Sequence, residues 1–145
     1  THVDASKGMV QWAKENSVAS DVADKNVRWL VDDCLKFVKR EIRRGNKYDA
    51  IVMDPPSYGR GANGEKWGLE ENICEMLECC AKLLDPDKGF LVLNLYSLGL
   101  SALLSRTALR QAFGSTGKEE AGELYFADRN GKELPLGTFC RFTRK

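Results

Sequence analysis

The stretch Tyr48-Asp-Ala-Ile-Val-Met-Asp-Pro-Pro-Ser-Tyr58 decides the fold, because an apolar run stops at an acidic residue and two prolines. Residues 48–53 predict a strand of the kind that is buried on both faces of a parallel sheet. Prolines lack an N–H and fix φ, so the strand must end here and the turn that follows is stiff. The turn presents the Asp54 carboxylate and the Pro55 carbonyl as acceptors, with Tyr58 available to stack on a flat ring. An exocyclic amine or a nucleobase would suit this arrangement.

Strands and helices alternate on either side of this stretch. On the N-terminal side we expect a strand ending at residue 4, a helix over 7–18, a strand over 26–31 and a helix over 35–44 capped by Asp33. On the C-terminal side we expect a polar loop over 54–68, a helix over 69–84, a strand over 90–96 and a helix over 97–113. Two last strands, 123–128 and 136–143, meet at Asn130-Gly131, a strong hairpin signal. The predicted class is α/β, with a mainly parallel sheet flanked by helices and an antiparallel hairpin strand at its C-terminal end.

Length and composition narrow the function. The 145 residues fit one domain, and 22 Lys and Arg against 21 Asp and Glu leave a net charge of +1, which excludes a strongly basic nucleic-acid binder by net charge alone. Five cysteines without a C-x-x-C pair argue against a disulfide framework and are expected to be small core residues. With the single histidine His2, a metal site is not expected. The expected location is the cytoplasm.

Acidic residues follow three successive predicted strands. Asp4 follows Val3, Asp32 and Asp33 follow Val31, and Asp54 follows Met53. In open α/β sheets, ligands bind at the carboxyl ends of the strands. Because neighbouring strands lie about 5 Å apart, we expect these carboxylates to face one crevice and to bind a ligand with several donors.

These motifs carry a family resemblance over nearly the whole chain. Val3-Asp-Ala-Ser6, Val31-Asp-Asp33 and the stretch 48–58 resemble the Rossmann-like, class I S-adenosylmethionine-dependent methyltransferases, in particular the branch of the large-subunit rRNA cytosine-C5 methyltransferases. The resemblance implies S-adenosylmethionine as the cofactor. By this resemblance Asp4 binds the ribose hydroxyls, Ala5 packs near the adenine and Asp33 binds the adenine amino group. Asp54 lies beside the transferring methyl and, with Pro55 and Tyr58, forms the catalytic site.

The chain departs from that branch in two ways. The family's first strand and glycine-rich loop, which hold the methionine end of the cofactor, are absent, so the chain is expected to be the C-terminal part of a longer one. The cysteine nucleophile that follows the fifth family strand is also missing, since that place reads Asn94-Leu-Tyr-Ser97. An N- or O-methyl acceptor therefore fits better than cytosine C5.

Two surfaces are candidates for contact with the substrate. Residues 59–64 match G-x-G-x-x-G, yet they follow a Pro-Pro turn rather than linking a strand directly to its helix, so we interpret them as a flexible lid. Arg60, Lys66 and Trp67 on this loop are the predicted substrate-binding residues, and an ordinary solvated loop is the alternative. A basic helical face, Lys36, Lys39, Arg40, Arg43 and Arg44, is interpreted first as a solvent-exposed face and second as a surface that steers RNA.

The predicted function is transfer of a methyl group from S-adenosylmethionine to a nucleobase in RNA, with rRNA as the expected partner and no membrane or metal. The alternative is a non-catalytic methyltransferase-like module or fragment that binds no cofactor by itself. Without the family's first strand, three arrangements are considered. The strand ending at Asp4 pairs directly with the strand at 48–53, the chain borrows an edge from another copy, or the N-terminus is disordered and 48–53 becomes a new edge. In each case we expect the pocket to keep its adenosine side and lose its methionine side.

Overall fold

The computed structural model describes residues 1–61, 64–96, 99–115 and 117–144 and contains both helices and strands. In chain order its elements are β1 (His2–Asp4), α1 (Lys7–Ala19), β2 (Trp29–Val31), α2 (Cys34–Arg43), β3 (Ala50–Met53), β4 (Tyr58–Arg60), β5 (Lys66–Gly68), α3 (Leu69–Leu83), β6 (Phe90–Leu95), α4 (Ala102–Phe113), β7 (Gly117–Ala127) and β8 (Glu133–Arg144). The predicted α/β class is confirmed. Within these residues no helix is long and apolar enough to cross a membrane.

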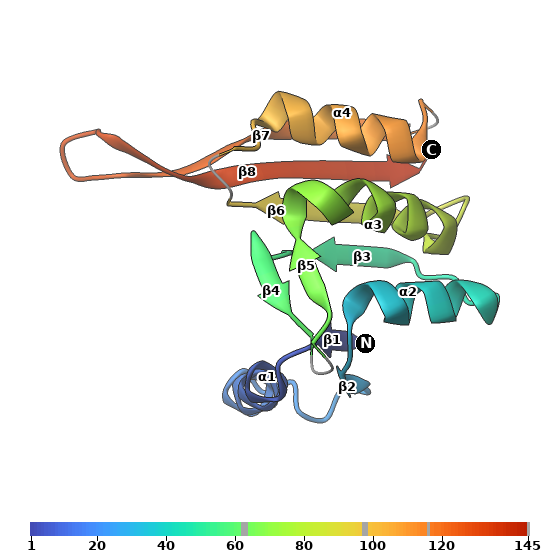
Figure 1. Ribbon diagram of the computed structural model, residues 1–145. Helices are drawn as coiled ribbons and strands as arrows, with labels where there is room; N and C mark the ends of the chain where they lie inside the picture. Colours follow the sequence, from blue (N-terminus) through green and yellow to red (C-terminus); the bar gives the residue numbers. More distant parts are fainter. Residues whose placement is uncertain (62–63, 97–98, 116, 145) are drawn as a thin grey trace.

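The strands form one larger sheet and two small ones (Figure 1). The main sheet has the order β3-β6-β8-β7, in which β3 and β6 are parallel and β8 pairs antiparallel with both β6 and β7. β1 and β2 make a separate parallel pair, and β4 and β5 make a separate antiparallel hairpin. The main sheet is therefore mixed.

Helix starts follow side-chain caps. Ser6, Asp33 and Ser101 each accept a hydrogen bond from the backbone N–H three residues later, and each begins a helix. The prediction that the last helix starts at residue 97 is wrong, because the Ser101 cap places its first turn at Ala102. Residues 97 and 98 lie outside the described part of the chain.

The core lies on one face of the main sheet. Leu91, Leu93 and Leu95 alternate along β6 and are almost completely buried, together with Cys140 and Phe142 of β8. The helices α3 and α4 cover this face, as Figure 1 shows, and contribute further buried side chains such as Leu77 and Leu109. Period-2 alternation on the strands and helical spacing on α3 together produce this core.

The prediction that residues 48–53 form a strand buried on both faces is wrong. β3 is half-exposed, and the Val52 side chain is 75% exposed. Within the described residues β3 pairs only with β6, while Ile51 and Met53 pack against the core on one face. Among the described residues, the structure shows neither direct pairing of this strand with β1 nor a disordered N-terminus, because β1 pairs with β2. Pairing of β3 with an edge from another copy stays a prediction.

Two further segments differ from the sequence prediction. The expected loop over 54–68 contains the β4–β5 hairpin. The final hairpin is longer than predicted and projects from the body as an arm (Figure 1). Its turn contains Gly131 at φ 78°, as the Asn-Gly signal predicts.

The cysteines are only partly core residues. All five are free; Cys79, Cys80 and Cys140 are buried as predicted, whereas Cys34 and Cys74 are exposed. Of the exposed pair, Cys34 is the first residue of α2 and Cys74 lies in α3.

Candidate active site

Asp4 lies at the end of β1, in the turn that leads into α1. Its Oδ1 accepts the Ser6 N–H at 2.7 Å, and the Ser6 hydroxyl in turn caps the helix. The carboxylate is half-buried, and Ala5 between them is half-buried as well. The turn therefore fixes Asp4 at the carboxyl edge of β1, where sequence analysis placed it.

Asp32 and Asp33 have separate roles at the end of β2. Asp33 Oδ1 accepts the Lys36 N–H at 2.8 Å and caps α2. Asp32 forms an ion pair with Arg40 at 2.6 Å, so its charge is already neutralised by the protein. Within the described residues the second oxygens of Asp4 and Asp33 have no hydrogen-bond partner, which leaves them for a ligand.

Cys34 shows that these carboxylates lie together. Its thiol points at the Val3 carbonyl, with a sulfur–oxygen distance of 3.5 Å. Desolvation of the sulfur, reinforced by the negative charges of Asp4, Asp33 and Asp32, raises the pKa of the Cys34 thiol to about 11. The cluster is thus strongly electronegative and keeps Cys34 as a thiol, which makes this cysteine a poor nucleophile. No group of three His, Cys, Asp or Glu suited to a metal ion occurs in the described ranges.

Asp54 lies apart from this cluster, at the end of the edge strand β3. Its side chain is exposed, and the half-buried Pro55 follows it. Tyr58 opens β4 and is 83% exposed, so its ring is free to stack against another flat group. Within the described residues β3 does not pair with the β1–β2 sheet, so a single crevice that contains all the carboxylates stays a prediction.

The predicted substrate-binding residues all lie on the β4–β5 hairpin. Arg60 and Lys66 face each other in its register and are exposed. With Tyr58 and the half-buried Trp67 they line an open surface cavity of about 450 Å³. The Trp67 indole N–H donates to the Pro56 carbonyl at 2.7 Å, so any substrate contact of Trp67 involves the face of its ring.

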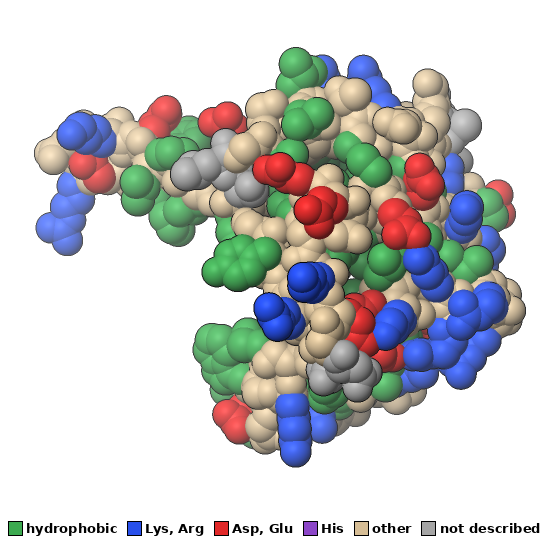
Figure 2. Space-filling model, in the orientation of Figure 1, with side chains coloured by type: hydrophobic (Ala, Val, Ile, Leu, Met, Phe, Trp, Pro, Cys, Tyr) green, Lys and Arg blue, Asp and Glu red, His purple; other side chains and the backbone are tan. Residues whose placement is uncertain are grey.

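The two groups of candidate residues are joined through α2. Lys36 pairs with Glu65, next to β5, and Lys39 pairs with Glu75 of α3 at 2.6 Å. Arg44 also has a carboxylate partner in the protein, namely Glu41. Basic side chains gather over this helix in Figure 2, but most are engaged in such pairs, which supports the interpretation of a solvent-exposed face.

Glu41 forms the most buried polar junction between these parts. Its side chain is 1% exposed and accepts hydrogen bonds from Asn46, Tyr48 and Arg44, with Arg28 at 3.8 Å. The hydrogen bond from Asn46, followed by those from Tyr48 and Arg44, lowers the pKa of the Glu41 carboxyl below its usual value despite its burial. α2 is thereby fixed to the segments that enter β2 and β3.

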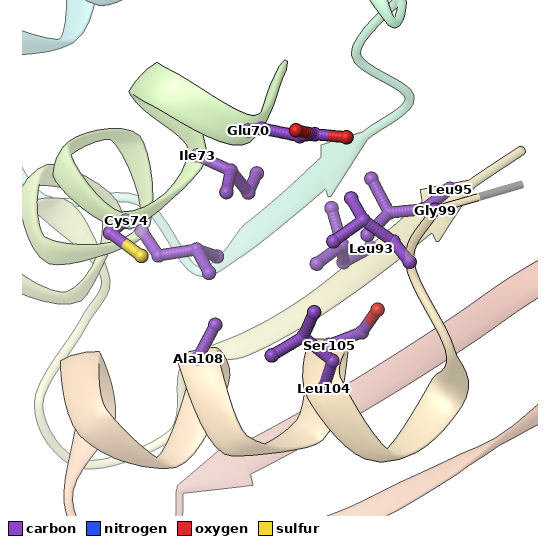
Figure 3. Close-up of a pocket in the computed structure, with 11 residues that line it drawn as sticks. Glu70, Ile73, Cys74, Leu93, Leu95, Gly99, Leu104, Ser105 and Ala108 are labelled. Atoms are coloured by element: carbon purple, nitrogen blue, oxygen red, sulfur yellow. The ribbon is translucent and has the colours of Figure 1, made fainter. Parts of the chain in front are cut away.

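A second cavity, of about 300 Å³, opens between α3, β6 and α4 (Figure 3). Its walls are mostly apolar, and Glu70, Cys74 and Ser105 supply the polar side chains. No sequence motif predicts this cavity, because its lining residues come from α3, β6, α4 and the segment before α4, and each is typical of a core or helix-surface position.

Comparison with known proteins shows that the chain is similar in sequence and fold to S-adenosylmethionine-dependent methyltransferases. No family model matches the chain. A SAM-dependent methyltransferase from Agrobacterium tumefaciens is 38% identical over 99% of this chain, with a TM-score of 0.92. The ribosomal RNA large subunit methyltransferase K/L of Shewanella frigidimarina is 30% identical over 95 residues, 65% of this chain. The resemblance stated from the sequence is confirmed.

A more distant structure and the coverage of these relatives complete the comparison. A methyltransferase in complex with SAH, 17% identical, matches 97% of this chain with a TM-score of 0.75 and shares its fold. The chain spans 48% of the Agrobacterium protein and 13% of the Shewanella protein. It therefore corresponds to one part of each of these relatives.

Proposed function

We propose that this chain contributes the adenosine side and the acceptor side of an S-adenosylmethionine-dependent methyltransferase that modifies a nucleobase in RNA, of the rRNA kind, in the cytoplasm. The observation that carries the proposal is the placement of Asp4, Asp33 and Asp54 at or just beyond the carboxyl ends of three strands, in a chain 38% identical to a SAM-dependent methyltransferase. The relatives named above are methyltransferases, which favours an enzyme over the alternative, a non-catalytic module.

The carboxylate cluster fits the adenosine part of the cofactor. Ribose hydroxyls and an adenine amino group are donors, and Asp4 and Asp33 each have one oxygen without a partner in the described structure. We assign Asp4 to the ribose hydroxyls and Asp33 to the amino group, with Ala5 packed beside the adenine. We assign Asp33 rather than its neighbour Asp32 to the amino group, because the charge of Asp32 is already paired with Arg40.

The turn after β3 fits the methyl acceptor. Bound S-adenosylmethionine supplies an electrophilic methyl group, and the residues of this chain orient the acceptor toward it. The Asp54 carboxylate and the Pro55 carbonyl accept hydrogen bonds from an exocyclic amine, while Tyr58 stacks on the base. Holding the two reactants in this geometry provides most of the rate in a direct displacement. Arg60 and Lys66 bind phosphates on the same side of the hairpin.

The open edge of β3 indicates how the domain is completed. A strand edge presents unpaired N–H and C=O groups, and Val52 leaves apolar surface exposed beside them. We infer that a further strand lies between β1 and β3, and that residues 1–145 are the C-terminal part of a single catalytic domain. An exposed edge of this kind also permits pairing with a second copy, which is the alternative source of that strand.

Calorimetric titration with S-adenosylmethionine tests this proposal. The complete protein that carries this chain should bind the cofactor and transfer methyl groups to rRNA. The isolated 145-residue chain should bind at least about 100-fold more weakly, because it lacks the backbone N–H groups that hold the methionine end. Equal affinity of the two would show that the pocket is complete in this chain, and absence of binding by the complete protein would exclude the enzyme.

A further inference from the structure

We propose that Trp67 is a positioning residue that fixes the acceptor-binding turn by holding the Pro56 carbonyl. The inference rests on the proposed function, since it concerns the turn that carries Asp54 and Tyr58. It assigns Trp67 a role beyond the substrate contact expected from the sequence.

The two prolines explain why such a residue is needed. Pro55 and Pro56 have no N–H, so in this part of the turn the backbone can be held only through its carbonyl groups. Pro56 O accepts the Trp67 indole N–H at 2.7 Å, and Ser57 O accepts the Leu69 N–H at 2.9 Å. Two consecutive carbonyls of the turn are thus held by donors from the other end of the hairpin.

The donors are themselves anchored. Leu69 begins α3 and is 2% exposed, and the Trp67 ring packs against the core while its N–H reaches outward to the turn. Indole has a single donor, and here that donor is used entirely within the protein. On the other side of the turn, Tyr58 is exposed. The turn therefore has one side fixed to the core and the other open to an acceptor.

The far end of the hairpin is fixed as well. The Gly61 N–H donates to the Glu65 carbonyl at 2.9 Å, and the Glu65 carboxylate pairs with Lys36 in the first turn of α2. The same helix is capped by Asp33, the residue assigned to adenine. The β4–β5 hairpin therefore links α2, on the adenosine side, to the acceptor turn. The Trp67–Pro56 hydrogen bond joins the hairpin to that turn.

The test is Trp67→Phe in the complete protein, which removes the donor and keeps an aromatic ring. Trp12→Phe, on the exposed face of α1, is the matched control. Deuterium exchange of a peptide covering residues 57–69 should become about tenfold faster in Trp67→Phe, with unchanged thermal stability and no change in the control. The kcat for methyl transfer should fall about fivefold to tenfold, while the KM for S-adenosylmethionine stays within about twofold.

The two measurements separate the inference from the proposed function. Unchanged exchange, faster exchange with unchanged kcat, or a large loss of thermal stability would each overturn the positioning role. A parallel loss of cofactor affinity would also overturn it, because the effect would then extend beyond the turn. If the wild-type protein transfers no methyl group, the proposed function fails, and the exchange measurement alone decides whether Trp67 holds the turn.

Discussion

The two parallel strand pairs of this protein differ sharply in burial. In the β3–β6 pair, Leu91, Leu93 and Leu95 of β6 are almost inaccessible and are covered by α3 and α4. In the β1–β2 pair each strand has three residues, and most of them are only half-buried. The buried apolar side chains therefore lie mainly in the main sheet and its covering helices, whereas the small sheet has Asp4 and Asp32 at its carboxyl edge.

The small sheet depends on polar and ionic links to the rest of the molecule. Glu41 ties α2 to the segments before β2 and β3, and the Lys36–Glu65 and Lys39–Glu75 pairs tie it to the hairpin and to α3. The two exposed lysine–glutamate pairs each contribute little to the free energy of folding. A strand between β1 and β3 would add hydrogen bonds along both open edges, which is the physical reason to expect one.

The largest expected effect concerns the main sheet. Leu91→Ala should lower the free energy of unfolding of the complete protein by about 2–5 kcal/mol, because it leaves a cavity in the best-packed layer. Val3→Ala in β1, which is half-buried, should cost clearly less. Denaturant titration measures both, and equal losses would contradict the difference in burial between the two strand pairs.

The next effect separates chemistry from stability. Asp54→Ala should reduce kcat for methyl transfer by about 10²–10³-fold, because it removes the acceptor aimed at the substrate amine, and should leave the fold intact since this side chain is exposed. Asp49→Ala, also exposed and directly before β3 at its opposite end, is the control. Activity of Asp54→Ala within a few-fold of wild type would remove Asp54 from the catalytic site.

Substitutions in the carboxylate cluster should weaken cofactor binding rather than slow methyl transfer. Asp4→Ala and Asp33→Ala should each weaken S-adenosylmethionine binding by about 1–3 kcal/mol through loss of a charge-assisted hydrogen bond. Asp32→Ala should have a much smaller effect, because Asp32 is paired with Arg40. Calorimetry on the complete protein decides, and the reverse order for Asp32 and Asp33 would show that the adenine residue is misassigned.

The junction between the two regions should be sensitive to acid. The pKa of Glu41 is lowered in the folded protein, so its stabilising contribution is present above the pKa of an unfolded Glu, about 4.3, and is lost as the pH falls through the lower folded value. Glu41→Gln should cost about 1–2 kcal/mol at neutral pH and flatten the loss of stability below about pH 4. The same pH dependence of the free energy of unfolding in the wild type and in Glu41→Gln would contradict this prediction.

The smallest effects concern RNA. Arg60→Ala and Lys66→Ala should each weaken RNA binding a few-fold and reduce the slope of log K against log salt by about 0.7 for a single-stranded site. Arg43→Ala, an exposed cation on α2, should leave that slope unchanged. A larger effect of Arg43 would move the RNA contact from the hairpin to the basic helical face.

Much of the local structure follows from the sequence. Ser6 and Asp33 cap the predicted helices, Asn130-Gly131 makes the predicted turn, and Asp54-Pro55 ends the predicted strand. These features depend on the hydrogen-bonding capacity or fixed dihedrals of residues close together in the chain. The predicted strands also placed Asp4, Asp33 and Asp54 at or just beyond strand ends, as the structure shows.

Other features required the tertiary structure. The apolar run 48–53 does not show whether another strand lies beside it. Its composition predicts burial on both faces, but Val52 is exposed. Which of Asp32 and Asp33 has a cation beside it depends on Arg40, which lies eight residues from Asp32, on α2. Strand pairing between distant segments divides the carboxylates between two sheets. A contact between distant residues likewise brings the Trp67 indole to the Pro56 carbonyl. Sequence determined the elements and their caps because those are local interactions, and only the fold determined which edges stay open and which side chains meet, because burial and pairing depend on what lies across the sheet.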